Sequence, residues 1–570
     1  MAVYHLALLL SLTSLSLALV ASVNSTCRCF PGDACWPSPT EWSSFNTSLG
    51  GKLVATLPLA APCHSEFAGT STYNNATCQT LQKDWTLPQG HYDSSSSIMA
   101  PFFANQSCDP FDGESAQCVV GTYVSYAVNI SGPADVAKTI KFAKQRNIRL
   151  VIRNTGHDYN GKSTGAGAIA VWTHHLKDIS FHDYNSTYYS GKAIKVGAGV
   201  QGMEAYAAAN ASGLAVVSGE CPTVGFAGGY TQGGGHSALA SKYGLAADQT
   251  LEFEVVDGTG KLIHATRDKN SDMYWALSGG GGGTYGVVLS MTSKAHPDII
   301  TSGANLTFTN QNITQDTFYK AVSAWHEVLP AIVDAGAMTV WSFTNTSWAL
   351  MPLTAPGLSK AQVTALLKPF MDSLTALGIQ YTSFVGQFSG YLEEFDNMFN
   401  TIEVGIAQYG GRFIPRSVVA NNNTALTAAY RNITEDGAIF IGVGVNVSEK
   451  VSGDVYNAVN PGWRDCLIDT VITTPWNFTA PWSEMVANQV KMTDNYLPQL
   501  AALTPGGGAY LNECDFKQPD WQQVLYGSNY DRLLAIKNKH DPDHIFYATT
   551  AVGSDYWQVE SDGRLCKAQA

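Results

Sequence analysis

Two glycine-spaced segments constrain the fold of this chain more than any other feature. The first, RNTGHDY, spans residues 153–159, and the second, SGECPTVGFAGGYTQGGGH, spans residues 218–236. Glycine adopts positive φ at little cost and has no Cβ to keep a ligand away from the main chain. Each segment also carries one nucleophilic side chain, His157 or Cys221. Together they predict backbone loops that hold one large planar or phosphorylated ligand at two points.

Size and charge narrow the class of protein. A chain of 570 residues exceeds what one hydrophobic core usually organises, so we expect two domains. The formal charge of -13 is spread without long runs of one sign. Because nucleic acids and anionic membranes attract clusters of Lys and Arg, neither is expected as a partner.

The beginning of the chain is typical of a secretory leader. Residues 6–20 form an apolar run followed by small residues, which fits a cleaved signal better than a membrane span; a buried helix is the alternative. We expect a signal peptide at residues 1–24 and, since no later segment has twenty uninterrupted apolar residues, no membrane association after its removal. Fourteen Asn-x-Ser/Thr sequons predict N-glycans on a secreted, extracellular protein.

The cysteines agree with an oxidising compartment. The chain has eleven, and seven of them precede residue 120: Cys27, Cys29, Cys35, Cys63, Cys78, Cys108 and Cys118. We expect these to form disulfides, whose pairing the sequence does not specify. An odd total leaves at least one cysteine without a disulfide partner, and Cys221, isolated in its glycine-rich segment, is the candidate.

Hydrophobic periodicity predicts an α+β protein. We expect a helix at residues 131–146, strands at 148–152, near 168 and near 194, a hairpin over 251–266, and a helix at 529–539. Composition and motifs divide the chain into a cysteine-rich segment at 25–118, a first domain at 119–300, a second domain at 301–505, and a tail at 506–570 that returns to the first domain.

Three short patterns suggest other functions, but their context argues against them. Residues 156–163, GHDYNGKS, satisfy the Walker A pattern, and residues 161–165 imitate a nucleophile elbow. Both patterns require a helix directly after the loop, and none is predicted there. No zinc-ligand spacing occurs among the nearby histidines His157, His174, His175 and His236. We therefore expect no NTPase, no serine hydrolase and no metal site.

Five separated motifs resemble the berberine-bridge-enzyme-like branch of the vanillyl-alcohol-oxidase flavoprotein superfamily. In chain order they are RNTGH, SGECPTVG, KYGLAAD, SGGGGGTYG and NYDRLLAIKNKHDPDHIF, which begin at Arg153, Ser218, Lys242, Ser278 and Asn529. The likeness covers residues 119–300 and 506–553 and is greatest to secreted fungal members of alcohol-oxidase type. It implies a PCMH-type FAD-binding domain completed by the C-terminal segment, and an α+β substrate domain with an antiparallel sheet.

The resemblance implies FAD held by two covalent bonds. His157 matches the histidine that bonds the flavin 8α-methyl group, and Cys221 matches the cysteine that bonds ring carbon 6; both residue types are suitable nucleophiles. Residues 153–158 and 279–283 match the pyrophosphate cradle, where successive N–H groups bind an anion. The other residues implied as FAD contacts are Arg153, Asn154, Thr155, Gly156, Asp158, Gly219, Val224, Gly225, Gly228, Gly229, Tyr230, Gly235, Tyr243, Gly244, Asp248, Val287, Val288 and Asn512.

The second segment also departs from the family pattern. Relatives have CPTVGxGGH, whereas this chain has CPTVGFAGGY, which is one residue longer and ends in Tyr230 instead of histidine. His236 then aligns with a position often held by an active-site tyrosine, where it either assists proton removal or bonds a ribityl hydroxyl. Val224 matches the family's oxygen gatekeeper, and its small side chain favours reaction with O2.

The tail supplies the implied catalytic residues. YLNECD, from Tyr510, is similar to the family's Y-x-N-Y-x-D segment. Tyr510 is the candidate base, helped by a carboxylate or a basic neighbour, because a phenol must have its pKa lowered to act near neutrality. Glu513 replaces the second tyrosine and either reaches the substrate or braces the loop.

The predicted activity is that of a secreted flavoprotein oxidase. Its small-molecule substrate is an alcohol, a sugar or a biosynthetic intermediate, and O2 reoxidises the flavin to give H2O2. An oxidative cyclase and a non-catalytic flavin- or carbohydrate-binding glycoprotein are the alternatives.

Overall fold

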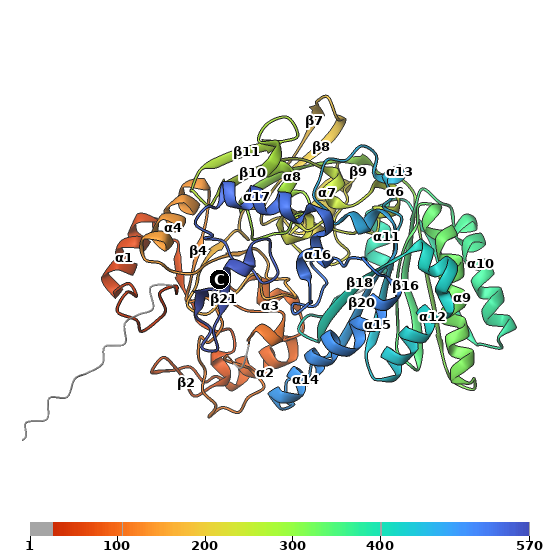
Figure 1. The fold of residues 1–570 in the computed structure, drawn as a ribbon, viewed down its shortest axis with the longest axis horizontal. Helices are drawn as coiled ribbons and strands as arrows, with labels where there is room; N and C mark the ends of the chain where they lie inside the picture. The colour runs from red at the N-terminus through yellow and green to blue at the C-terminus, as the bar shows by residue number, and fades with distance from the viewer. Residues whose placement is uncertain (1–26, 105–106, 400–401, 569–570) are drawn as a thin grey trace, which may run out of the picture.

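The computed structural model describes residues 27–104, 107–399 and 402–568 (Figure 1). The leader predicted at residues 1–24 therefore lies outside the described residues. Within the described ranges, no helix combines the length and apolar character that a membrane crossing requires.

The first sheet supplies the two strands that flank the loop of residues 154–163 in the sequence. Its four strands are ordered β1 (Leu53–Ala55), β4 (Tyr126–Asn129), β6 (Ile169–Trp172) and β5 (Leu150–Arg153), and the last three are parallel. Helix α4 (Pro133–Gln145) connects β4 to β5. It has Pro133 in its first turn and buries Val136, Ile140 and Ala143, which are spaced for one face. The predicted helix and strands in this region are confirmed.

A second, antiparallel sheet packs beside the first. Its five strands are ordered β11 (Leu262–Thr266), β10 (Thr250–Asp257), β12 (Gly286–Lys294), β8 (Ser190–Gly197) and β7 (Ile179–Asn185). The predicted hairpin is β10 and β11, and its turn is held by Asp257, whose Oδ1 accepts from the N–H groups of Thr259 at 2.9 Å and Lys261 at 3.0 Å.

The third sheet has seven strands, all antiparallel. Their order is β17 (Tyr381–Phe388), β14 (Thr301–Thr309), β16 (Ser347–Pro356), β15 (Met338–Phe343), β19 (Ile439–Gly444), β20 (Cys466–Pro475) and β18 (Ala407–Pro415). One face is covered by helices α9 (Gln315–Asp334), α10 (Lys360–Ala376) and α12 (Arg416–Glu435) (Figure 1). Buried Trp325, Trp341 and Trp348 dominate the core between these layers. The expected antiparallel sheet is present.

The opposite face of the seven-stranded sheet turns toward the glycine-rich loops. Alternate residues of a strand face opposite sides. Gly410 of β18 therefore packs toward Met492 and the helices, whereas its neighbour Gly411 lies against the carbonyl oxygen of Glu513. The predicted boundaries at residues 300 and 505 remain predictions. One buried cluster contains side chains from both sides of each boundary, so this cluster marks neither of them.

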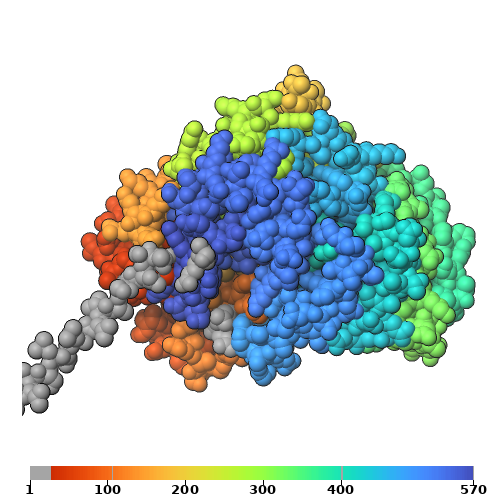
Figure 2. All heavy atoms as spheres, viewed as in Figure 1, coloured from red at the N-terminus to blue at the C-terminus, as the bar shows by residue number. Residues whose placement is uncertain are grey.

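The C-terminal segment returns to the first two sheets. Residues of this segment lie on the surface between the N-terminal residues and the third sheet (Figure 2). Helix α17 (Tyr530–His540) carries Lys537 in its last turn, and the buried Nζ of Lys537 forms an ion pair with Asp541 at 2.6 Å and donates to the carbonyl of Thr284 at 2.8 Å. Phe546 bridges to Leu150 of the first sheet. The predicted return of the chain is confirmed.

Disulfides tie down the N-terminal segment. The pairs are Cys27–Cys566, Cys29–Cys35, Cys63–Cys78 and Cys108–Cys118. The first closes a loop with a sequence separation of 539 and joins the two ends of the described chain. Cys221, Cys466 and Cys514 are free thiols, which confirms the prediction for Cys221.

No helix follows the Walker-like loop. Residues 161–168 form turns that lead into β6. The carboxylate of Asp158 organises this loop, accepting from the N–H of Asn160 at 2.9 Å and of Ser163 at 2.7 Å. The P-loop and nucleophile-elbow interpretations are thereby excluded, since both need a helix at this point.

Candidate functional site

A cavity separates the two glycine-rich loops from the turn at residues 510–513. The predicted FAD contacts that line it are Asn154, Thr155, Gly156, His157, Asp158, Gly219, Cys221, Val224, Gly225, Gly228, Gly229, Tyr230, Val288 and Asn512. The three predicted catalytic residues, His236, Tyr510 and Glu513, line it as well. The fold thus brings the separated motifs to one place, although their roles toward a cofactor remain predictions.

The first loop is built to accept an anion. Gly156 has a φ of +84°, and the N–H groups of residues 155–158 donate to no other group within the described ranges. Four consecutive unpaired N–H groups beside a cavity form a nest for negative charge. Asn154 adds a buried Oδ1 without a partner among the described residues. These features fit the pyrophosphate and polar edges of FAD.

Glycine is required where the second loop meets the first. A Cβ on Gly225 would lie 2.4 Å from Nδ2 of Asn154, and one on Gly228 would lie 2.8 Å from it. By contrast, a Cβ on Gly229 would meet open space. The loop is therefore closely packed on one side and open toward the cavity on the other, as expected for a ligand cradle.

The run at residues 279–283 offers fewer free N–H groups for an anion than predicted. The N–H groups of Gly279 and Gly281 donate to the carbonyl of Gln232 at 3.1 and 2.8 Å, so they are not free for an anion. Gly280 donates to Ala276. Only Gly282 and Gly283 of the run line the cavity. The expected nest is therefore confined to the second half of the run.

The two candidate attachment residues meet at one hydroxyl group. Nε2 of His157 lies 2.7 Å from Oγ1 of Thr223, and Sγ of Cys221 lies 3.6 Å from the same oxygen. Burial, with added repulsion from His91 and Arg153, lowers the pKa of His157 to about 3, so its imidazole is neutral. Burial raises the pKa of the Cys221 thiol above its usual range.

Six predicted FAD contacts lie outside the cavity wall: Arg153, Gly235, Tyr243, Gly244, Asp248 and Val287. The buried guanidinium of Arg153 donates to the carbonyls of His91 and Ser94, both at 3.0 Å. Val287 faces the core behind the first sheet, since it alternates with Val288 along β12. These residues support the loops from behind.

The KYGLAAD motif has a structural explanation. Asp248 is fully buried, pairs with Arg464 at 2.8 Å and accepts from the N–H of Leu245 at 2.8 Å. Gly244 has a φ of +91°, and the ring of Tyr243 stacks on His296 at 3.9 Å. The motif therefore fixes a turn that supports the cavity without lining it.

Tyr230, which replaces the family histidine, braces its own loop. Its hydroxyl donates to the carbonyl of His236 at 2.8 Å. The ring also fills the space beside Gly219 and Gly235, where a Cβ would come within 3.2 and 2.8 Å of it. The extra residue of this loop is thereby accommodated, and His236 is held facing the cavity.

His236 lies between two carboxylates. Its Nδ1 is 3.0 Å from Glu220 and its Nε2 is 3.1 Å from Glu513. Burial acts to lower the pKa of His236, but the two carboxylates outweigh it and raise the pKa well above its ordinary value. His236 is therefore an imidazolium at neutral pH. Glu513 lines the cavity, and whether it contacts the substrate or only braces the loop stays a prediction.

The pKa of Tyr510 is not lowered as expected for a residue that acts as a base near neutral pH. Burial and the neighbouring charge of Glu513 raise its pKa well above the ordinary phenol value, the opposite of the predicted direction. Its hydroxyl oxygen accepts from Nδ2 of Asn512 at 2.7 Å, and Asn512 also donates to the carbonyl of Gly229 at 2.9 Å. Tyr510 thus keeps its proton and links the turn to the second loop.

Asp469 of β20 lies behind this end of the cavity, beside His236 and Glu513, and was missed from the sequence. It is fully buried, and neither carboxylate oxygen has a partner among the described residues. Burial and the nearby carboxylate of Glu513 raise the pKa of Asp469 well above its usual range, so it holds a proton. The available signal was a single charge in the otherwise uncharged strand CLIDTVITTP.

Other wall residues were also missed. Glu220 directly precedes Cys221 and lines the cavity. Thr223, two residues after Cys221, contacts its sulfur without lining the cavity. For both residues, their place inside the SGECPTVG motif was the only signal. Tyr159 lines the cavity and stacks on Tyr409 of β18 with ring centroids 3.8 Å apart. No local pattern predicts that stack, since Tyr159 lies in the loop after β5 and Tyr409 comes from a strand of the third sheet.

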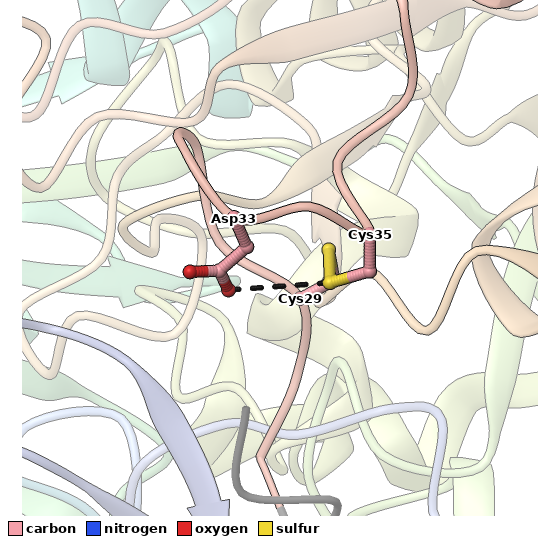
Figure 3. Close-up of side chains that lie close together, drawn as sticks. All are labelled: Cys29, Asp33 and Cys35. Atoms are coloured by element: carbon pink, nitrogen blue, oxygen red, sulfur yellow. Dashed lines mark hydrogen bonds between the residues drawn. A yellow bond between two sulfur atoms is a disulfide. The ribbon is translucent and has the colours of Figure 1, made fainter. Parts of the chain in front are cut away.

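Among the described residues, two groups of side chains have the composition of a metal site. Cys29 and Cys35 form a disulfide and their neighbour Asp33 pairs with Arg564, so this group offers no thiolate ligands (Figure 3). The other group, His236, Asp469 and Glu513, has ligand atoms within 4.8 Å of one another. Carboxylates engage both ring nitrogens of His236, which leaves it no lone pair to offer.

Two family models match the segments that surround this cavity. A family model described as FAD binding domain matches residues 124–266, and one described as berberine and berberine like matches residues 509–553. The FAD-linked oxidoreductase patO of Aspergillus clavatus is 51% identical over 548 residues, which cover 96% of this chain and 95% of that protein. The bifunctional decalin synthase calF of Penicillium decumbens is 41% identical over 574 residues, 99% of each chain.

A solved structure extends the agreement to the fold. The crystal structure of the VAO-type flavoprotein MtVAO615 from Myceliophthora thermophila C1 is 41% identical, with a TM-score of 0.91 over 95% of this chain and 100% of that chain. The expected PCMH-type α+β fold is confirmed by this likeness. From its loops, its C-terminal motif and its relatives, the chain belongs to the berberine-bridge-enzyme-like family of VAO-type, FAD-linked oxidoreductases.

Proposed function

We propose that this enzyme is a secreted oxidase that carries FAD on His157 and Cys221 and acts on an alcohol, a sugar or a related metabolite. The supporting observation is that one cavity holds both nucleophiles and a buried group of carboxylates around His236. When bound, FAD would take a hydride from the substrate carbon and pass two electrons to O2, giving H2O2.

The chain would hold FAD mainly through its main chain. The free N–H groups of residues 155–158 and the cavity-lining Gly282 and Gly283 would bind the pyrophosphate. Val224 lines the cavity in the same loop as Cys221, and its small side chain would leave room for O2.

Glu513 is the proposed proton acceptor. His236 is already protonated, and Tyr510 keeps its proton because its pKa is raised, so neither can accept one near neutral pH. The side chain of Glu513 is 21% exposed and that of Glu220 is 11% exposed, which makes Glu513 the more accessible carboxylate. Glu513 would take the substrate hydroxyl proton, while the contact with His236 would hold the Glu513 carboxylate in place.

Tyr510 would position the substrate. Its oxygen already accepts from Asn512, which leaves its own O–H free to donate toward a substrate oxygen. This role replaces the base predicted from the sequence and keeps Tyr510 in contact with the substrate.

The test compares Glu513→Gln with wild type. We expect flavin content to be unchanged and the rate of flavin reduction by an alcohol to fall about 100-fold, because a positioned base contributes that much. Glu484→Gln, an exposed change on α14 (Trp482–Lys491), is the matched control. Peroxide release over a panel of alcohols and oligosaccharides identifies the substrate. Equal reduction rates in Glu513→Gln and wild type would refute the assignment of the base.

A second candidate function is oxidative ring closure. It is favoured by the relative calF, which is named a bifunctional decalin synthase. Product analysis separates the two, since a carbonyl product supports the oxidase and a new ring supports the cyclase. A protein that binds flavin but releases no peroxide with any substrate would instead be the non-catalytic glycoprotein.

Secretion and N-glycosylation are part of the proposal. They rest on the apolar leader and the fourteen sequons. We expect the native protein in the culture medium, beginning near residue 25 and losing mass on treatment with an N-glycosidase. Retention inside the cell with an intact leader would contradict this part.

A further inference from the structure

We infer that the hydroxyl group of Thr223 prepares both His157 and Cys221 for attachment to FAD, accepting a hydrogen bond from one and donating to the other. This inference rests on the two attachments proposed above. Thr223 is a positioning residue in this account, because it acts through its neighbours.

One hydroxyl group serves both side chains. Oγ1 of Thr223 lies 2.7 Å from Nε2 of His157 and 3.6 Å from Sγ of Cys221. A hydroxyl has one proton to donate and two lone pairs that accept. It can therefore bond both neighbours at once only by accepting from at least one of them.

The direction of the two bonds decides whether the neighbours are nucleophiles. If Thr223 donated to Nε2, the ring proton would sit on Nδ1 and the sulfur would have to keep its own proton, so neither group could attack. If Thr223 accepts from Nε2–H and donates to sulfur, Nδ1 has a free lone pair and the sulfur is supported as a thiolate. Only the second arrangement suits attachment.

The surroundings favour this arrangement. The imidazole of His157 is neutral and bears a single ring proton. Its Nδ1 hydrogen-bonds to no other residue in the described part of the chain, and His157 lines the cavity. With Nε2 engaged by Thr223, Nδ1 is the nitrogen left for the flavin.

The sulfur receives help from three donors. The hydroxyl and N–H of Thr223 and the N–H of Val224 all act to lower the pKa of Cys221, against the larger effect of burial. Glu220, Tyr159 and Tyr409 are the other titratable groups near this sulfur, and their negative forms oppose the thiolate. His91 and Arg153 face His157.

Helix α5 (Gly202–Ala211) holds Thr223 in place. The N–H of Gly202 donates to the carbonyl of Val224, and the N–H of Met203 donates to that of Pro222, both at 2.9 Å. The side chain of Gln201 donates to the carbonyl of Thr223 itself at 2.8 Å. The hydroxyl is thus presented from a loop fixed on both sides.

The attachment chemistry balances with O2 as the oxidant. At each site a C–H bond of the flavin is replaced by a C–N or C–S bond, and the proton is released. The two electrons from each C–H bond reduce the ring and then pass to O2, giving H2O2. Thr223 is unchanged throughout.

The experiment compares hydroxyl-free and hydroxyl-bearing variants. Thr223→Val and Thr223→Ala remove the hydroxyl, and Thr223→Ser keeps it. Each purified holoenzyme is incubated in air from pH 6 to 9, and proteolytic peptides are analysed over time for flavin on His157 and on Cys221. Thr139→Val, a buried change in α4 away from the cavity, is the matched control.

We expect attachment at Cys221 to be about tenfold slower in both hydroxyl-free variants near neutral pH, since a hydrogen bond to a charged group is lost. The defect should shrink as pH rises and more thiolate forms. Thr223→Ser and Thr139→Val should match wild type. This pH profile distinguishes support of the thiolate from a loss of packing.

Three outcomes would overturn the inference. Full attachment at the wild-type rate in Thr223→Val and Thr223→Ala would overturn this inference and leave the proposed function standing. So would a defect that is independent of pH or shared by Thr223→Ser. A wild-type enzyme without covalent flavin would instead refute the proposed function, and this inference with it.

Discussion

At the scale of single residues, the end of the cavity near His236 is governed by competition for protons. His236 shares its two ring nitrogens with Glu220 and Glu513, and Asp469 lies beside them without a hydrogen-bond partner in the described part of the chain. Like charges buried this closely cannot all ionise. The proton therefore stays on Asp469, while Glu513 lines the cavity and is the proton acceptor proposed above.

Asp469→Asn should make the protein more stable at neutral and alkaline pH. The pKa of Asp469 is raised in the native state, whereas the unfolded chain releases this proton above about pH 4. Wild type therefore loses stability as pH rises toward the native pKa, and asparagine does not. We expect the advantage of the variant to vanish below about pH 4, as measured by denaturant unfolding across the pH range.

Glu394→Gln provides the comparison outside the cavity. Burial raises the pKa of Glu394 to about 8, so the same reasoning gives wild type a penalty that grows above about pH 4.5 and levels off above about pH 8. The variant should gain stability over this window and keep wild-type activity. Asp396→Asn, an exposed change on the same helix α11 (Tyr391–Met398), should shift neither. A pH-independent difference for either buried variant would contradict the account.

At the scale of elements, strand β18 at the edge of the seven-stranded sheet packs against the turn that carries Glu513. Its alternate residues face opposite sides, with Gly411 toward the turn and Gly410 toward the helices. A Cβ on Gly411 would lie 2.5 Å from the carbonyl oxygen of Glu513, which is too close for the backbone to remain where it is.

Gly411→Ala should therefore displace the turn and slow proton removal, with FAD content unchanged. We expect flavin reduction to slow at least about tenfold, since small misplacements of catalytic groups have large effects on rate. Gly410→Ala is the matched control, because its Cβ would meet the flexible side chain of Met492 on the far side. It should lower stability without changing the reduction rate, and equal rate losses in both variants would argue against a specific role for the turn.

Local patterns predicted the elements well and the catalytic group only in part. The helices α4 and α17 and the loops around His157 and Cys221 are encoded by short segments whose periodicity or glycine content is visible in the sequence. Asp469 could not be placed in this way, because strand alternation gives the face of a residue but not what packs against that face. The raised pKa of Tyr510 likewise depends on burial and on Glu513, which only the assembled fold supplies.

At the scale of the whole molecule, the two ends of the described chain are joined. The disulfide Cys27–Cys566 closes a loop with a sequence separation of 539, whereas Cys63–Cys78 closes one of 15. If cross-links act mainly by restricting the unfolded chain, the long loop contributes about 6 kcal/mol and the short one about 3 kcal/mol.

The paired change Cys27→Ala with Cys566→Ala should therefore destabilise the protein more than Cys63→Ala with Cys78→Ala. Guanidinium unfolding followed by tryptophan fluorescence would compare the two midpoints. Both variants should retain flavin, because none of the four cysteines lines the cavity. The reverse order of midpoints would show that native-state packing, and not loop closure, sets these contributions.

The most direct test of the account is mass spectrometry of proteolytic fragments from the purified wild-type protein. We predict one flavin that joins the peptide containing His157 to the peptide containing Cys221. Two unmodified peptides from a yellow protein that releases its FAD on acid precipitation would contradict the central claim.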